Sequence, residues 1–180
     1  MTRSTPFALE CCKIEVAFGD VVALTAAIRG AHAVISCLGH VRDRSAIADA
    51  SVLRDGAVAL TTAMGAARVS RLVVVSAAGA YVQGDDPLSR FIAKPIVGKL
   101  FGGVFPDTRA MEDVVRASAT DWTILRPSRL IPGTSARTYR YGVDHDVWWH
   151  YSTTFDTVGR AAVDALADPA WVGHAVFLTE

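Results

Sequence analysis

Short apolar runs recur along this sequence, and segments of helical periodicity lie between them. The clearest runs are AVISCL at residues 33–38 and RLVVVS at residues 71–76. Their apolar residues do not alternate with polar ones, which is typical of parallel strands whose two faces are both covered by helices. Strands that alternate with helices form βα units, so the sequence predicts an α/β fold with a parallel sheet and flanking helices.

We expect a single domain over residues 1–180, because the length and the 51% hydrophobic content suit one large core. Strands are expected at residues 13–18, 33–38, 71–76, 122–125 and 175–178. Helices are expected at residues 21–29, 48–67, 88–98, 107–118 and 156–167. Asp107 is placed to cap the fourth of these helices. One stripe of the second helix collects Leu53, Ala57, Leu60 and Met64.

Charge and composition exclude several classes of protein. The 18 basic and 18 acidic residues cancel, whereas nucleic-acid and membrane-surface binding usually need a basic excess, so we expect neither partner. The sequence has no run of 18 apolar residues and no signal peptide, which predicts a cytoplasmic protein. The three cysteines and five histidines follow no disulfide or metal-ligand spacing, so we expect reduced thiols and no metal site.

Four stretches resemble the atypical short-chain dehydrogenases/reductases, the group that includes the NmrA-like proteins and the biliverdin and flavin reductases. The stretches are VAFGD at residues 16–20, GAHAVISCLG at 30–39, RLVVVSAAG at 71–79 and DWTILRP at 121–127. Their order and spacing extend the similarity over nearly the whole chain. The resemblance implies a Rossmann-like sheet in which residues 71–76 lie between residues 33–38 and 122–125, all parallel.

The opening of that family's fold has no counterpart in this sequence. A family member begins with a strand, a glycine-rich turn and a helix that hold the cofactor pyrophosphate, but no G-x-G-x-x-G occurs here. We therefore expect an incomplete, N-terminally truncated domain that lacks the first strand–helix–strand unit. The implied cofactor, NADP or NAD, is expected to bind weakly, in the high-micromolar range, because charge-assisted backbone hydrogen bonds are lost.

The missing unit would leave residues 33–38 at a sheet edge. These residues carry no charge that would prevent pairing with another strand. Residues 13–18 can pair with them directly through a right-handed crossover, or a second copy of the chain can cover the edge in a homodimer. The crossover helix at residues 21–29 favours the first arrangement.

The resemblance assigns cofactor contacts, and each has a purely structural alternative. Arg3 would meet the 2′-phosphate of NADP, and Asp20 would bind the adenine amino group or else cap the helix at residues 21–29. One strand end would follow the ribose and pyrophosphate, and its glycine would either give room for the ligand or serve as an ordinary turn glycine. This strand end comprises Ser36, Cys37, Leu38 and Gly39. The segment beside the nicotinamide, or else a strand-ending turn, comprises Pro127, Ser128 and Arg129.

Ser76 ends the central strand, at the carboxyl edge where open α/β sheets bind ligands. The resemblance makes it the candidate catalytic residue, a serine that hydrogen-bonds a substrate carbonyl, and the alternative is a buried, hydrogen-bonded serine. The family's Tyr-x-x-x-Lys proton donor is missing, because no lysine stands four residues after a tyrosine. Tyr81 is instead followed by Asp85, which would raise the pKa of the tyrosine. Thr108 stands where the flavin and biliverdin reductases can have a histidine.

The resemblance implies an NAD(P)H-dependent oxidoreductase that acts on a small planar or carbonyl substrate. Aromatic residues would either stack on a planar substrate or form a packed cap or a subunit contact, and they are Tyr139, Tyr141, Trp148, Trp149 and Tyr151. Two other readings stay open. One is a non-catalytic, NmrA-like dinucleotide sensor that signals through a protein partner, and the other is a truncated fragment with no activity of its own.

Overall fold

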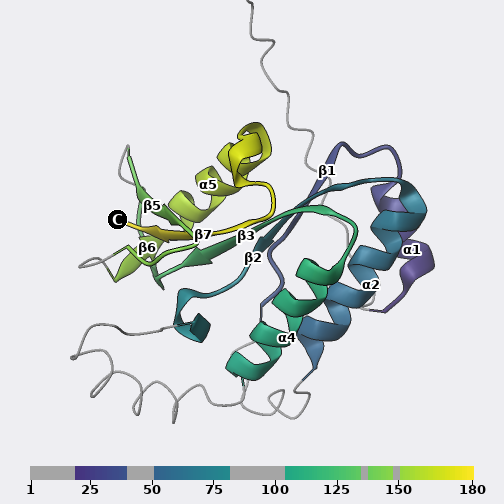
Figure 1. Cartoon of the computed structure of the whole chain (residues 1–180), viewed down its shortest axis with the longest axis horizontal. Helices are drawn as coiled ribbons and strands as arrows, with labels where there is room; N and C mark the ends of the chain where they lie inside the picture. Colours follow the sequence, from purple (N-terminus) through teal and green to yellow (C-terminus); the bar gives the residue numbers. More distant parts are fainter. Residues whose placement is uncertain (1–18, 40–50, 82–103, 135–137, 148–150) are drawn as a thin grey trace, which may run out of the picture.

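The computed structural model describes residues 19–39, 51–81, 104–134, 138–147 and 151–180 (Figure 1). Within these residues the larger sheet has five strands, in the order β1-β2-β3-β7-β5. Their bounds are β1 Ala33–Ser36, β2 Arg71–Val75, β3 Asp121–Pro127, β5 Arg140–Val143 and β7 His174–Thr179. The first four strands in that order are parallel, and β5 joins β7 antiparallel. A small parallel sheet pairs β4, Arg129–Ile131, with β6, Ser152–Thr154.

The predicted order of the central strands is confirmed. β2 lies between β1 and β3 and is parallel to both. Its side chains alternate between two apolar cores, because Leu72 and Val74 pack into one buried cluster while Val73 packs into the other. Both faces of the strand are therefore buried, which is why apolar residues do not alternate with polar ones in its sequence.

Helices cover both faces of this sheet (Figure 1). Their bounds are α1 Val21–Ile28, α2 Val52–Ala67, α4 Val104–Ala117 and α5 Phe155–Ala167. The first three helices pack on one face, and α5 packs on the other. The predicted stripe of α2 is confirmed, since Leu53, Ala57 and Met64 are buried and Leu60 packs against them. Short 3-10 turns follow β2, at η2 Ala78–Tyr81, and precede β7, at η4 Pro169–Trp171.

Asp107 does not cap its own helix, and this prediction is wrong. α4 begins at Val104, so Asp107 lies within its first turn and is buried. Pro106 is compatible with the earlier start, because proline is tolerated in the first turn of a helix. The Asp107 carboxylate accepts hydrogen bonds from the amides of Leu53 at 2.8 Å and Arg54 at 3.1 Å. It therefore caps α2 from the neighbouring helix.

The remaining element bounds agree with the sequence to different degrees. α1, α5 and β7 match their predicted ranges to within one residue at each end. β1 ends at Ser36, two residues early, and α2 begins at Val52 rather than at residue 48. The predicted strand at residues 13–18 and helix at residues 88–98 lie outside the described residues, so the pairing expected for residues 13–18 stays a prediction. Within the described ranges no helix is long and apolar enough to cross a membrane.

The burial of β2 yields a direct test of the core. Val74 is 2% exposed, so Val74→Asp places an unpaired charge in an apolar interior, which costs several kcal/mol and consumes much of a typical domain's stability. Val22, on α1, is 81% exposed, so Val22→Asp is the matched control. We expect urea denaturation to show Val74→Asp largely unfolded and Val22→Asp close to wild type. Equal midpoints for the two variants would show that β2 is not core.

Candidate functional site

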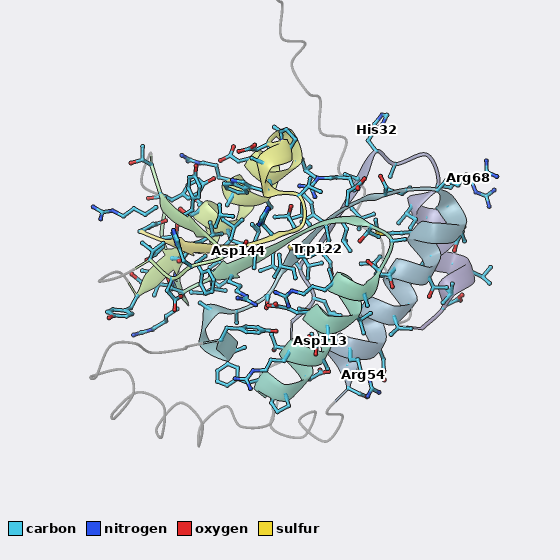
Figure 2. All side chains as sticks on the ribbon, in the orientation of Figure 1. His32, Arg54, Arg68, Asp113, Trp122 and Asp144 are labelled. Carbon is cyan, nitrogen blue, oxygen red and sulfur yellow. The ribbon has the colours of Figure 1, made fainter. Side chains whose placement is uncertain are left out.

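Three segments singled out by the sequence lie at the carboxyl edge of the sheet. They lie at the C-terminal ends of β1, β2 and β3, which are neighbouring parallel strands, so these ends share one edge. The amide of Ser76, directly after β2, donates to the Leu125 carbonyl of β3 at 2.7 Å. In Figure 2, His32 and Arg68 mark the opposite, amino end of the sheet. Residues 36–39, Ser76 and residues 127–129 therefore form one rim, called the carboxyl rim below.

Asp20 caps α1, because its Oδ1 accepts a hydrogen bond from the Ala23 amide at 2.9 Å. The capping alternative is thus confirmed. α1 leads into β1 through a short turn at Gly30, where φ is +82°. A helix that directly precedes a parallel strand runs against it, so the N-terminus of α1 points toward the carboxyl rim. The predicted contact of Asp20 with adenine stays a prediction.

Gly39 is a glycine that the described fold does not explain. The backbone φ of Gly39 is not positive, unlike the φ of Gly19, Gly30, Gly133 and Gly173. A Cβ built on Gly39 would meet no described atom within 4 Å. Neither a left-handed turn nor crowding among the described residues therefore requires glycine at this position. The space that the described residues leave open at Gly39 suits a backbone that a ligand approaches closely.

The rest of this strand end is half-buried or exposed. Ser36 and Leu38 line a small apolar recess between the end of β1 and helices α2 and α4. Cys37 is a free, exposed cysteine, and partial desolvation raises the pKa of its thiol. Since the thiolate is the nucleophilic form, Cys37 is a poor nucleophile at neutral pH. This strand end can contribute backbone groups and apolar surface to a ligand.

A buried ion-pair network lies directly behind Ser76. Glu112, on α4, is fully buried, and the Ser76 hydroxyl donates to its Oε1 at 2.6 Å. Arg126, on β3, contacts both carboxylate oxygens, with Nε 3.1 Å from Oε1 and Nη2 2.6 Å from Oε2. Arg116 adds an ion pair of 2.8 Å to Oε2. Ser76 is thus hydrogen-bonded, as the structural alternative predicts, but half-buried rather than buried, and its catalytic role stays a prediction.

Tyr81 covers this network at the end of η2. The guanidinium carbon of Arg126 lies 3.5 Å from the centroid of the Tyr81 ring, and the Phe177 ring is 5.0 Å away from the same carbon. Burial, followed by the Glu112 carboxylate, raises the pKa of Tyr81 above its ordinary value. The predicted direction is confirmed, while the contribution of Asp85, which lies outside the described residues, stays a prediction. Tyr81 stays neutral at physiological pH and is a weak proton donor.

The segment at the end of β3 leads directly into β4 and is not the strand-ending turn of the structural alternative. Pro127 is buried as the last residue of β3. The Ser128 hydroxyl is 2.7 Å from the Thr153 hydroxyl and donates to the Leu178 carbonyl at 3.1 Å. Arg129 is exposed and pairs with β6 through β4. These residues lie on the carboxyl rim and join the two sheets, while their predicted contact with nicotinamide stays a prediction.

Two of the described aromatic residues contact the layer formed by α5 and η4. The Tyr139 hydroxyl donates to Asp164 at 2.6 Å, and the Tyr141 ring centroid is 4.9 Å from that of Trp171. Burial, and then the Asp164 carboxylate, raises the pKa of Tyr139. Tyr151 is exposed. Trp148 and Trp149 lie outside the described residues, as does Arg3, so their predicted roles stay predictions.

Comparison with known families decides what kind of protein this carboxyl rim belongs to. Residues 7–169 match the family described as NAD(P)H-binding. The chain belongs to the NAD(P)H-binding family. The predicted membership of an NAD(P)-binding family and the predicted cofactor, NADP or NAD, are confirmed by this match.

Solved structures share the fold at low sequence identity. A short-chain dehydrogenase/reductase from Veillonella parvula in complex with NADP is 20% identical, with a TM-score of 0.71 over 93% of this chain and 71% of that one. ChuY, an anaerobillin reductase from Escherichia coli, is 20% identical, with a TM-score of 0.69 over 89% and 71%. A search of well-characterised protein sequences finds no significant match. The predicted Rossmann-like α/β fold is confirmed by these likenesses.

In this NAD(P)H-binding protein, the ion pair of Glu112 and Arg126 behind Ser76 was not predicted from the sequence. Glu112 stands between Met111 and Val115, two residues on the buried side of α4. Arg126 follows the apolar core of β3. A charge on an apolar face is seldom buried without a partner, so each position indicated a buried charge that needs a partner of opposite charge. Their pairing depends on the contact between α4 and β3, which no spacing in the sequence reveals. Thr108, expected in place of a histidine, is buried in α4.

The network predicts a large difference between two neighbouring acidic residues. Glu112→Ala leaves the buried charge of Arg126 without its carboxylate, which typically costs about 3–5 kcal/mol. Asp113, labelled on α4 in Figure 2, is exposed, so Asp113→Ala is expected to change stability by less than about 0.5 kcal/mol. Urea unfolding monitored by circular dichroism measures both variants. A Glu112→Ala midpoint equal to that of Asp113→Ala would contradict a buried ion pair.

Proposed function

We propose that this chain is an NAD(P)H-dependent oxidoreductase of the atypical short-chain dehydrogenase type, which reduces a small planar or carbonyl compound at the carboxyl rim. Bound NAD(P)H would supply the hydride. The observation that carries this proposal is the position of Ser76. It ends the central strand, between the two segments expected to follow the cofactor, in a chain of the NAD(P)H-binding family.

The residues of the rim fit a dinucleotide. Residues 36–39 would follow the ribose and pyrophosphate, with the open space at Gly39 admitting the ligand backbone. Asp20, at the N-terminus of α1, would reach the adenine, and residues 127–129 would lie beside the nicotinamide. Arg3 would meet the 2′-phosphate of NADP. The relative that holds NADP supports the same cofactor here.

The proton for the product would come from solvent. Tyr81 is a weak proton donor because its pKa is raised by burial and by Glu112. The proton of Ser76 is already shared with Glu112. A substrate that takes hydride directly and a proton from water suits this arrangement, and the anaerobillin reductase among the structural relatives supports a reductase. A single domain, a cytoplasmic location and a small-molecule partner belong to the same proposal.

A dinucleotide sensor of the NmrA type is the second candidate. The engagement of the Ser76 hydroxyl by Glu112 favours it, because a serine held in this way is not free to donate to a substrate carbonyl. Both candidates require dinucleotide binding. They differ in whether bound NADPH is consumed.

The proposal predicts that blocking the space at Gly39 weakens NADPH binding without unfolding the protein. Gly39→Val meets no described atom but fills space assigned to the ligand, so we expect affinity to fall at least about tenfold, or ~1.4 kcal/mol. Gly159→Val, on α5 and equally uncrowded, is the control and is expected to bind like wild type. Titration calorimetry with NADPH gives the affinities, and thermal melts check the fold.

Stopped-flow absorbance of NADPH with quinone and carbonyl acceptors then separates the two candidates. Loss of absorbance in wild type, and much less in Gly39→Val at subsaturating NADPH, supports the oxidoreductase. Binding without oxidation supports the sensor. Absence of NADPH binding, or equal binding by the Gly39→Val variant, would overturn the placement of the cofactor.

A further inference from the structure

The charge of Glu112 fixes the direction of its hydrogen bond with Ser76. The Glu112 carboxylate receives three guanidinium contacts, two from Arg126 and one from Arg116. An ionised carboxylate has no proton to give and can only accept. The Ser76 hydroxyl, 2.6 Å from Oε1, must therefore be the donor. The short distance is typical of a charge-assisted O–H···O⁻ bond.

This bond uses the only proton of the Ser76 side chain. A hydroxyl carries one donor and two acceptor lone pairs. No donor from the described residues makes a hydrogen bond to Ser76 Oγ, so its acceptor capacity is unused within this part of the chain. Ser76 is half-buried at the end of β2, on the carboxyl rim. A ligand at the rim would meet an acceptor there and not a proton.

The residues around Ser76 disfavour a change in the direction of this hydrogen bond. To donate to a ligand, the Ser76 hydroxyl would have to turn away from Glu112 and give up a charge-assisted hydrogen bond. Arg126 cannot easily move to compensate, because it is buried, makes two contacts to the carboxylate and lies against the Tyr81 ring. The network therefore fixes Ser76 in a single hydrogen-bonding role.

We propose that Ser76 acts as a hydrogen-bond acceptor toward the substrate, so that the site selects planar compounds that present an N–H or O–H group at this position. The inference rests on the oxidoreductase function proposed above and specifies its substrate class. A lactam or a similar ring N–H fits this requirement. A compound that offers only carbonyl oxygens to Ser76 does not.

A pair of planar diketones tests the inference. Isatin carries a ring N–H next to its carbonyls, and indane-1,2-dione has a CH₂ in its place, so the two differ in a single donor with almost no change of shape. The full 180-residue chain, saturated with NADPH, is assayed for reduction of each compound as wild type and as Ser76→Ala. Because each compound is compared with itself across the variants, differences in intrinsic reactivity cancel.

We expect Ser76→Ala to lower kcat/KM for isatin about 3–10-fold, as for the loss of one hydrogen bond, and to change the value for indane-1,2-dione less than about twofold. Ser118→Ala is the matched control. Its hydroxyl bonds Val115 at the C-terminal end of α4, and it is expected to behave like wild type with both compounds. Thermal melts of all three proteins verify folding.

The other outcomes overturn the inference. A similar loss for both diketones would mean that Ser76 donates to a carbonyl common to them, and no loss for either would mean that Ser76 does not touch the substrate. Failure of a protein that binds NADPH to reduce either compound would contradict the assigned substrate class while leaving dinucleotide binding intact. Failure to bind NADPH at all would instead remove the proposed function itself.

Discussion

The contact between Glu112 and Arg126 is the interaction on which the carboxyl edge of the larger sheet depends. It joins α4 to β3 through two hydrogen bonds in which neither partner is significantly exposed. A buried charge is tolerated only when it is paired, so each residue requires the other. The same carboxylate holds the hydroxyl of Ser76, and the same guanidinium supports the ring of Tyr81. One ion pair thus stabilises the packing of α4 on β3 and also positions Ser76 and Tyr81.

This sharing has a chemical consequence. In the arrangement found here Ser76 offers lone pairs to the rim, and Tyr81 is held neutral by burial and by the nearby carboxylate. Neither side chain is set up to deliver a proton. Under the proposed function, a reaction at the rim would therefore rely on the cofactor for hydride and on water for the proton.

The sequence predicted those features that depend on local pattern. The apolar runs placed β1, β2 and β7, and periodicity placed Leu53, Ala57 and Met64 on the buried side of α2. Local chemistry also gave capping as one of the two roles considered for Asp20, and the structure shows the cap. The sequence failed where a residue acts on a distant segment. Asp107 caps α2 across 54 residues, and Glu112 meets Arg126 only because α4 packs on β3. Such pairings arise from tertiary packing, and no spacing in the sequence identifies them.

The central claim is that the dinucleotide binds at the carboxyl rim, and amide chemical shifts test it most directly. The full chain, labelled with ¹⁵N, is titrated with NADPH while its amide resonances are followed. We expect the largest shifts at Ser36, Cys37 and Ser76, and almost none at Ser118 and Thr120, which lie in the turn before β3 at the amino end of the sheet. Shifts concentrated at Ser118 and Thr120, with Ser36 and Ser76 unchanged, would contradict the account.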